Sequence, residues 1–165
     1  MISLDCFILS ITVERKLNMI IAIASDHAGY ELKELIKDSI DKELHQVIDC
    51  GVDEGYMKVS HYPYAKKLCL SIVKEEADLG ILICGTGVGM SMAANRYEGI
   101  RAALVSDTYT AIKSKQHNHC NVLCLGSRVL GVELAKTIAD VWINAKPLKE
   151  YEANALAIDD GIGVV

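Results

Sequence analysis

The stretch ILICGTGVGMSMAANR, residues 81–96, contains the features that decide the fold. It opens with a continuous apolar run that ends at Cys84, which is the pattern of a parallel strand buried on both faces. Three glycines at every second position then turn the chain, and residues 89–99 have the pattern of a short helix that ends at a glycine. The stretch therefore predicts a strand, a glycine loop and a helix, with a thiol where the strand meets the loop.

The alternation of strand and helix continues on both sides of this stretch. Apolar runs predict five strands, at residues 19–25, 46–51, 79–84, 101–106 and 121–127. Apolar residues at helical spacing predict five helices, at residues 30–44, 63–78, 89–99, 108–116 and 132–145. This order predicts the α/β class, as a three-layer α/β/α sandwich with a five-stranded parallel sheet and a Rossmann-like architecture.

A chain of 165 residues has the length of one domain with a sizeable core. The first predicted strand starts at Met19, and we expect residues 1–18 to be an N-terminal extension that takes no part in catalysis. That segment carries Asp5 early and lacks the basic start and the small-residue cleavage site of a signal peptide. We expect residues 19–165 to form a single domain.

The composition excludes several classes of partner. The net charge of −5 leaves no basic surface for a phosphate backbone, so we expect no nucleic-acid binding. No window approaches the roughly 20 apolar residues that a membrane span needs, so we expect no membrane contact. The 6 cysteines include no C-x-x-C pair, and a chain of this length needs no disulfides, so we expect free thiols and a cytoplasmic protein.

Ligands of parallel α/β sheets bind at the carboxyl ends of the strands. This rule directs attention to three positions near the predicted element ends: Ser25–His27, the loop from Cys84 to Gly89, and His117–Asn118. The loop matches neither the dinucleotide-binding fingerprint nor the P-loop. Its glycines are equally compatible with a cradle of backbone N–H groups for an anion and with a simple tight turn.

Cys84 favours the cradle. A thiol at a helix N-terminus has a stabilised thiolate and can act as a base or nucleophile, although an isolated cysteine at a strand end is more often structural. Asp26 and His27, with a second imidazole at His117, can move protons on a polyol. If these groups act together, the first and third strands must be neighbours in the sheet.

The remaining histidines give weaker signals. His117, His119 and Cys120 are close in sequence, but their spacing fits no common zinc pattern, so we expect no metal site. His45 follows a predicted helix and is expected to be a solvated cap.

Six segments can be compared with known families: SDHAGYELKE, HYP, ADLGILICGTGVGMSMAANR, GIRAALVSD, QHN and NVLCLGSRVLGVELAK. In this order, over residues 19–145, they resemble the type B ribose-5-phosphate isomerases and their relatives that act on other sugar phosphates. The resemblance implies an aldose–ketose isomerase that works through an enediolate, without metal or organic cofactor. It implies the interconversion of ribose 5-phosphate and ribulose 5-phosphate, a reaction of the pentose phosphate pathway.

The resemblance also implies a role for each site residue. Cys84 would be the base that moves the proton between C1 and C2. The developing oxyanion would be held by Thr86 and by the N–H groups of Gly85, Gly87, Val88 and Gly89. His117 would open the furanose ring, Asp26 and His27 would bind and polarise it, and Asn118 and Arg128 would contact the substrate. The family has one branch whose base is a cysteine and another whose base is a glutamate at the position of Met90. Cys84 together with Met90 therefore resembles the cysteine branch.

Two departures from the family pattern concern the sugar. Family members carry arginines after the last long helix that grip the phosphate across a subunit interface, but the last arginine here is Arg128. Lys146 or Lys149 would have to substitute, without the bidentate fork of arginine. His61 stands where the pentose isomerases more often have aspartate, and a histidine there is found in the galactose-6-phosphate relatives.

These departures leave two alternatives to a pentose phosphate isomerase. One is an isomerase of another sugar phosphate, such as a hexose 6-phosphate. The other is a non-catalytic sugar-phosphate-binding protein, although such a protein has no need of the base at Cys84. For the isomerase we expect a homodimer or homotetramer with the site at the subunit interface.

Overall fold

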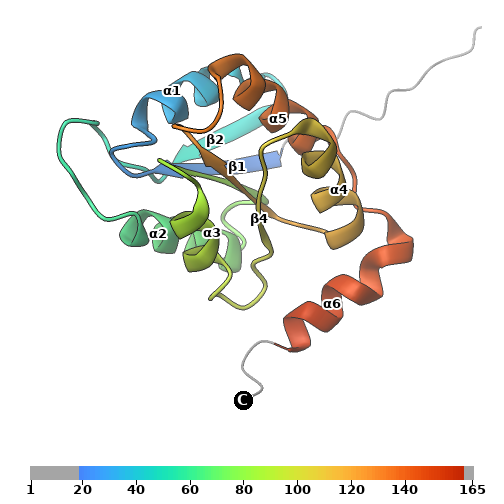
Figure 1. Cartoon of the computed structure of the whole chain (residues 1–165). Helices are drawn as coiled ribbons and strands as arrows, with labels where there is room; N and C mark the ends of the chain where they lie inside the picture. Colours follow the sequence, from blue (N-terminus) through green and yellow to red (C-terminus); the bar gives the residue numbers. More distant parts are fainter. Residues whose placement is uncertain (1–18, 162–165) are drawn as a thin grey trace, which may run out of the picture.

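Strand β3 (Leu79–Cys84) lies at the centre of a five-stranded parallel sheet (Figure 1). The computed structural model describes residues 19–161, and the strand order is β2-β1-β3-β5-β4. The other strands are β1 (Met19–Ser25), β2 (His45–Asp49), β4 (Ala102–Leu104) and β5 (Val122–Gly126). Because all pairs are parallel, the sheet has one carboxyl edge, where the strands end, and one amino edge, where they begin.

Helices cover both faces of the sheet, as strands buried on both sides require. On one face the large side chains Ile21 and Ile23 of β1 pack with α1 (Tyr30–Ser39), α4 (Thr108–Asn118) and α5 (Val132–Asn144). On the other face Ala22 and Ala24 pack with α2 (Tyr62–Val73) and α3 (Val88–Ala94). This alternation along β1 produces the predicted three layers.

The chain continues beyond the last predicted helix. After α5 it forms a short 3-10 turn, η1 (Lys149–Tyr151), and then α6 (Glu152–Asp160), which contacts α4 and lies at the lower right in Figure 1. Asp159 of α6 forms an ion pair with Arg101 at the start of β4. No helix in residues 19–161 is long and apolar enough to cross a membrane.

The predicted fold class is confirmed, and β1 and β3 are neighbours as expected. The first helix ends earlier than predicted, at Ser39, because Ile40 has an extended backbone with ψ of 130°. His45 is the first residue of β2, pairs with Met19 and is 8% exposed, so its prediction as a solvated helix cap is wrong. The predicted extension at residues 1–18 lies outside the described residues.

Candidate active site

The carboxyl edge of the sheet brings three of the predicted site segments together. The Asp26 N–H donates to the Ile83 carbonyl at 3.3 Å, which ties the end of β1 to β3. The Ser127 N–H donates to the Cys84 carbonyl at 2.9 Å, which ties the segment after β5 to the same strand. The Asp26 turn, the glycine loop and Arg128 therefore lie side by side.

Cys84 ends β3 with its side chain on the α2–α3 side of the sheet, and it is 6% exposed. Its sulfur accepts a hydrogen bond from the Gly87 N–H at 3.1 Å. Gly87 has a φ of 77°, in the left-handed region, and a Cβ there would lie 2.4 Å from Leu104 Cδ1. The left-handed φ favours glycine at this position, and the turn that Gly87 makes aims an N–H at the sulfur.

The other described cysteines have a different environment. Burial raises the pKa of the Cys69 thiol to about 12 and that of the Cys120 thiol to about 11. Burial also raises the pKa of Cys50 and of Cys124. These four thiols are held in the protonated form, which suits small buried side chains. Among residues 19–161, Cys84 is the cysteine whose sulfur receives a backbone N–H.

Asp26 and His27 follow β1 directly. The Asp26 carboxylate accepts the N–H groups of Ala28 at 2.9 Å and Gly29 at 3.1 Å, so its charge is met by backbone donors in a tight turn. The His27 ring is held through Nδ1, which lies 3.1 Å from the Val59 carbonyl oxygen. These contacts fix both side chains and leave Nε2 of His27 as the ring nitrogen that can form a hydrogen bond with a ligand.

Arg128 supplies a cation at the same edge. Its backbone N–H donates to the Gly85 carbonyl at 3.0 Å, and its exposed side chain runs beside Gly85. A Cβ on Gly85 would lie 3.4 Å from Arg128 Cδ. Thr86 is exposed, and its hydroxyl accepts the Val88 N–H over a long 3.4 Å. The loop thus combines a guanidinium, a hydroxyl and backbone donors around Cys84.

His61 joins the site from α2, where the sequence marked it only as a departure from the family pattern. It is the N-cap residue of α2, and its Nε2 lies 2.9 Å from the position that a Cβ on Gly89 would take. The imidazole therefore rests on the first turn of α3. A side chain at position 89 would have to displace the His61 ring from this contact.

His117 and Asn118 do not join this cluster. They form the last turn of α4, which begins after the carboxyl end of β4 and returns to the start of β5. A helix between two parallel strands must run back along the sheet, so this turn lies at the amino edge. From the sequence we expected both residues near the carboxyl ends of the strands. This expectation is wrong, because in a single chain both residues lie at the amino edge.

At the amino edge His117 has an aromatic neighbour that the sequence pattern did not identify. The ring of Tyr151, in η1, stacks on the His117 imidazole with centroids 4.3 Å apart. The Leu148 N–H donates to the Gln116 carbonyl at 3.0 Å, which holds the chain after α5 against α4. The stack fixes the orientation of an imidazole that is only half-buried.

The described part of the chain contains no group of three or more His, Cys, Asp or Glu side chains that could hold a metal ion. The chemistry available at the carboxyl edge is that of a thiol, a carboxylate, two imidazoles, a guanidinium and backbone N–H groups.

Comparisons with known proteins agree with one another. Residues 21–158 match the family model described as Ribose/Galactose Isomerase. The chain is 47% identical to ribose-5-phosphate isomerase B of Escherichia coli over 127 residues, which cover 76% of this chain and 84% of the relative. It is 39% identical to galactose-6-phosphate isomerase subunit LacB of Clostridium acetobutylicum over 145 residues, which cover 86% of this chain and 83% of the relative.

Solved structures show the same fold. The ribose-5-phosphate isomerase B of Mycoplasma genitalium, with bound ribulose 5-phosphate, superposes with a TM-score of 0.83 at 34% identity. The match covers 88% of this chain and 97% of that one. The likeness therefore extends over most of both chains.

Proposed function

The chain belongs to the ribose/galactose isomerase family, and from this premise we infer that it is a sugar-phosphate isomerase that interconverts ribose 5-phosphate and ribulose 5-phosphate. Relatives named as ribose-5-phosphate isomerase B, one of them with bound ribulose 5-phosphate, support the pentose substrate. The reaction moves one hydrogen between C1 and C2 of the open-chain sugar and converts an aldehyde into a ketone.

The observation that carries the chemistry is the hydrogen bond from the Gly87 N–H to the Cys84 sulfur. A hydrogen alpha to a carbonyl is only weakly acidic, so a base must act beside groups that stabilise the enediolate as it forms. A thiolate at Cys84 would be stabilised by the Gly87 N–H and by the N-terminus of α3. The same loop offers further donors for the substrate oxygen.

The proposed step begins with the open-chain aldose. Cys84 takes the proton from C2, the electron pair forms the C1–C2 double bond, and the carbonyl π electrons move to O1. Thr86 and the N–H groups of Gly85, Val88 and Gly89 hold the developing oxyanion. The C2 hydroxyl then gives its proton to O1, and its O–H electron pair forms the C2 carbonyl while the electron pair of the C1–C2 double bond takes the proton from the Cys84 thiol at C1. The thiolate is regenerated, and no net proton is consumed.

We propose that the complete site forms between two copies of the chain. Cys84 and His117 lie at opposite edges of one sheet, so one sugar cannot touch both within a chain. Apolar side chains near the glycine loop are exposed and suit a subunit contact: Val88 47%, Met92 63%, Leu104 41% and Tyr109 71%. In a homodimer, or a tetramer built from it, His117 and Asn118 of the second copy would face Cys84.

The same arrangement suggests how the phosphate is held. Arg128 lies beside the glycine loop and would bind it from the chain that supplies Cys84. Lys149 is exposed in η1, the turn whose Tyr151 stacks on His117, so it would approach together with that imidazole. One guanidinium and one ammonium would thus replace the arginines that the tail lacks.

A hexose 6-phosphate is the second candidate substrate. The galactose-6-phosphate isomerase subunit from Clostridium acetobutylicum is similar over most of its length, and His61 lies against Gly89 in the loop that would face the sugar. An imidazole here could contact the end of a longer sugar. The pentose remains the main proposal because the pentose isomerases predominate among the similar structures.

Hydrogen exchange tests the proposed function directly. The purified protein is incubated in deuterated water with ribose 5-phosphate or galactose 6-phosphate, and deuterium at C1 and C2 is followed by NMR. We expect incorporation with ribose 5-phosphate and its loss in Cys84→Ser. Incorporation with galactose 6-phosphate alone would move the assignment to the hexose, and no incorporation with either would overturn it.

A further inference from the structure

Ser127 bridges two segments of the candidate site whose strands do not pair. It follows β5, and in the strand order β3 separates β5 from β1. The Ser127 N–H donates to the Cys84 carbonyl at 2.9 Å, which fastens the residue to the end of β3. Its Oγ donates to the Ala28 carbonyl at 2.7 Å, in the turn that follows β1. One residue thus joins the Asp26 turn to the strand that carries Cys84.

The Asp26 turn lies directly over the end of β3, which brings it within reach of Ser127. A Cβ on Gly29 would lie 2.6 Å from the Ile83 carbonyl oxygen, so the backbone of the turn packs on the backbone of the strand. The Asp26 N–H donates to the same oxygen at 3.3 Å. The Ser127 hydroxyl bonds the turn in a part-buried setting, where a hydrogen bond is stronger than in water.

The hydrogen bond from Ser127 is continuous with the bonds that hold the Asp26 carboxylate. The Ala28 carbonyl and the Gly29 N–H belong to one peptide group. Its oxygen accepts from Ser127, and its N–H is shared between the Asp26 carbonyl at 3.2 Å and Asp26 Oδ1 at 3.1 Å. A hydrogen bond to the oxygen of a peptide polarises the group and strengthens the bond that its N–H donates. Ser127 therefore strengthens the contact that fixes Oδ1.

Asp26 keeps its second carboxylate oxygen for a ligand. Oδ1 accepts the N–H groups of Ala28 at 2.9 Å and of Gly29 at 3.1 Å, whereas no hydrogen bond from residues 19–161 reaches Oδ2. The two bonds to Oδ1 thus set the direction of Oδ2. A displacement of about 1 Å of a group that binds a reacting substrate can lower the rate by about 100-fold. The turn must therefore be held firmly relative to Cys84.

We propose that Ser127 is a positioning residue of the isomerase, which holds the Asp26 carboxylate through the Ala28–Gly29 peptide at a fixed distance from Cys84. The assignment rests on the proposed function, because Asp26 and Cys84 must reach the same sugar. In this role Ser127 acts through Asp26 and does not itself touch the substrate.

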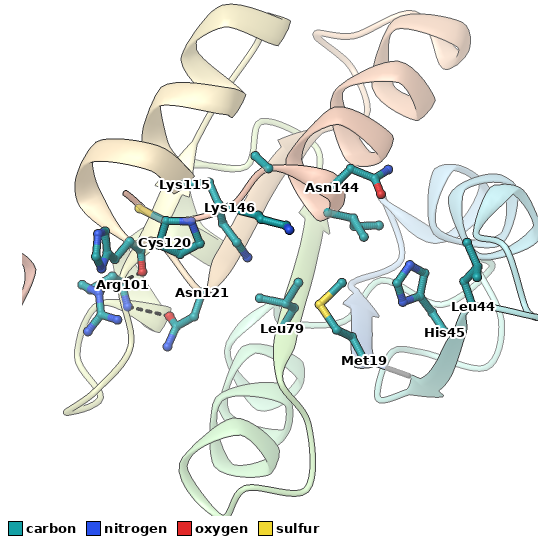
Figure 2. Close-up of a pocket in the computed structure, with 14 residues that line it drawn as sticks. Met19, Leu44, His45, Leu79, Arg101, Lys115, Cys120, Asn121, Asn144 and Lys146 are labelled. Atoms are coloured by element: carbon teal, nitrogen blue, oxygen red, sulfur yellow. Dashed lines mark hydrogen bonds between the residues drawn. The ribbon is translucent and has the colours of Figure 1, made fainter. Parts of the chain in front are cut away.

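The opposite end of β5 has a side-chain bridge of a different kind. Asn121, at the wall of the amino-edge cavity drawn in Figure 2, accepts the Arg101 N–H through Oδ1 at 2.9 Å. Its Nδ2 donates to the Gly99 carbonyl at 2.7 Å. These bonds join β5 to the chain that leads into β4, its own neighbour in the sheet. The Ser127 bridge instead crosses the end of β3 and ends on the turn that holds Asp26.

Amide NMR tests the bridge without any substrate. In the isotope-labelled full chain, Ser127→Ala removes the hydroxyl and keeps the N–H that binds Cys84. We expect the Gly29 amide proton to move upfield, because its peptide loses the polarising bond. Ser71→Ala is the matched control, since the Ser71 hydroxyl also donates to a backbone carbonyl at 2.7 Å, that of Leu68 on α2. An unchanged Gly29 resonance in Ser127→Ala, or an equal shift in Ser71→Ala, would overturn the proposal.

Kinetics then show through which residue Ser127 acts. We expect Ser127→Ala to lower kcat/KM for ribose 5-phosphate about threefold to tenfold, as the loss of one hydrogen bond does, and Ser71→Ala to leave it unchanged. In an Asp26→Ala background the further loss from Ser127→Ala should be less than about twofold, because the carboxylate that it positions is absent. The slow variants are followed by the accumulation of ribulose 5-phosphate over hours.

Three kinetic results would overturn the assignment. One is an unchanged kcat/KM in Ser127→Ala. Another is an equal loss with and without Asp26, which would show that Ser127 supports only the fold. The third is a loss that disappears in Arg128→Ala but persists in Asp26→Ala, which would show that Ser127 places the adjacent guanidinium. Failure of the proposed function gives a different result: the wild type would not convert ribose 5-phosphate, while the Gly29 amide would still report the bridge.

Discussion

Cys84 and His117 of one chain lie at opposite edges of the sheet, separated by the length of β3. The 6 residues of this strand span roughly 17 Å at the usual rise per residue. A catalytic group must come within about 3 Å of the atom on which it acts, or reach it through one water. The two residues can therefore serve one sugar only when they come from different copies.

Mixing two inactive variants tests this arrangement. Cys84→Ser and His117→Ala, each alone, should convert cyclic ribose 5-phosphate very slowly. Refolding them together in equal amounts should restore about one quarter of the wild-type activity, because half of the dimers are mixed and each mixed dimer has one intact site of two. If the mixture stays inactive although mixed dimers form, the two residues do not share a site between copies.

Cys84→Ser should reduce turnover by about 100-fold or more, because a hydroxyl is too weak an acid to supply the base. The serine is similar in size, so the melting temperature should change little. Cys69→Ala serves as the control, since the Cys69 thiol is fully buried in the core and its raised pKa keeps it protonated. Near-normal turnover in Cys84→Ser, measured by direct assay of ribulose 5-phosphate, would assign the base to another residue.

His117→Ala should impair ring opening more than isomerisation. We expect a loss of about 100-fold or more with ribose 5-phosphate. With 4-deoxyribose 5-phosphate, which lacks the hydroxyl that closes the furanose ring, the loss should be small. His119→Asn is the neighbouring control, because asparagine tolerates the left-handed φ of 50° at that position. Equal losses with both sugars would instead assign His117 to binding or to the proton transfer.

The sequence predicted the sheet well because its central strands are decided locally. β1 and β3 occupy the predicted residues, since both are continuous apolar runs bounded by polar turns. The Asp26 turn and the Cys84 loop also converge as expected, because parallel neighbours end at the same edge. In these places local pattern and tertiary packing favour the same structure.

Other features depend on packing that no local pattern contains. His45 follows a charged helix and resembles a cap, but pairing with Met19 takes it into the sheet. α6 has no continuous apolar stripe, and its position depends on contacts with α4 and on the ion pair between Asp159 and Arg101. The location of His117, in contrast, follows from the order of the elements alone, because a helix that follows a parallel strand must return to the amino edge. The prediction for His117 did not use this rule.

Arg128→Ala should raise the KM for ribose 5-phosphate by about tenfold or more, since a charge-assisted hydrogen bond contributes about 1.5–3 kcal/mol. The kcat should fall less, because the phosphate is remote from C1 and C2 and is bound equally in substrate and transition state. Arg96→Ala, at an exposed position after α3, is the matched control and should leave both constants unchanged. A fall in kcat with unchanged KM would show that Arg128 acts on the reacting atoms and does not hold the phosphate.

The buried thiols predict a loss of stability at alkaline pH. The pKa is raised from 9.0 in each case, to about 12 for Cys69 and to about 11 for Cys120, so the folded state holds these protons while the unfolded state releases them. Their contribution is complete below pH 9 and is lost as the pH rises toward each folded value, and at pH 10 the loss is on the order of 1–2 kcal/mol per thiol. Urea unfolding of the wild type at pH 7 and pH 10 should therefore show a fall in the free energy of unfolding that includes this amount for each thiol. The double variant Cys69→Ala/Cys120→Ala should be less stable at pH 7 but should lose about 3 kcal/mol less between the two pH values. An identical alkaline loss in the double variant would mean that other groups cause it, and that these two thiols ionise alike in the folded and unfolded chain.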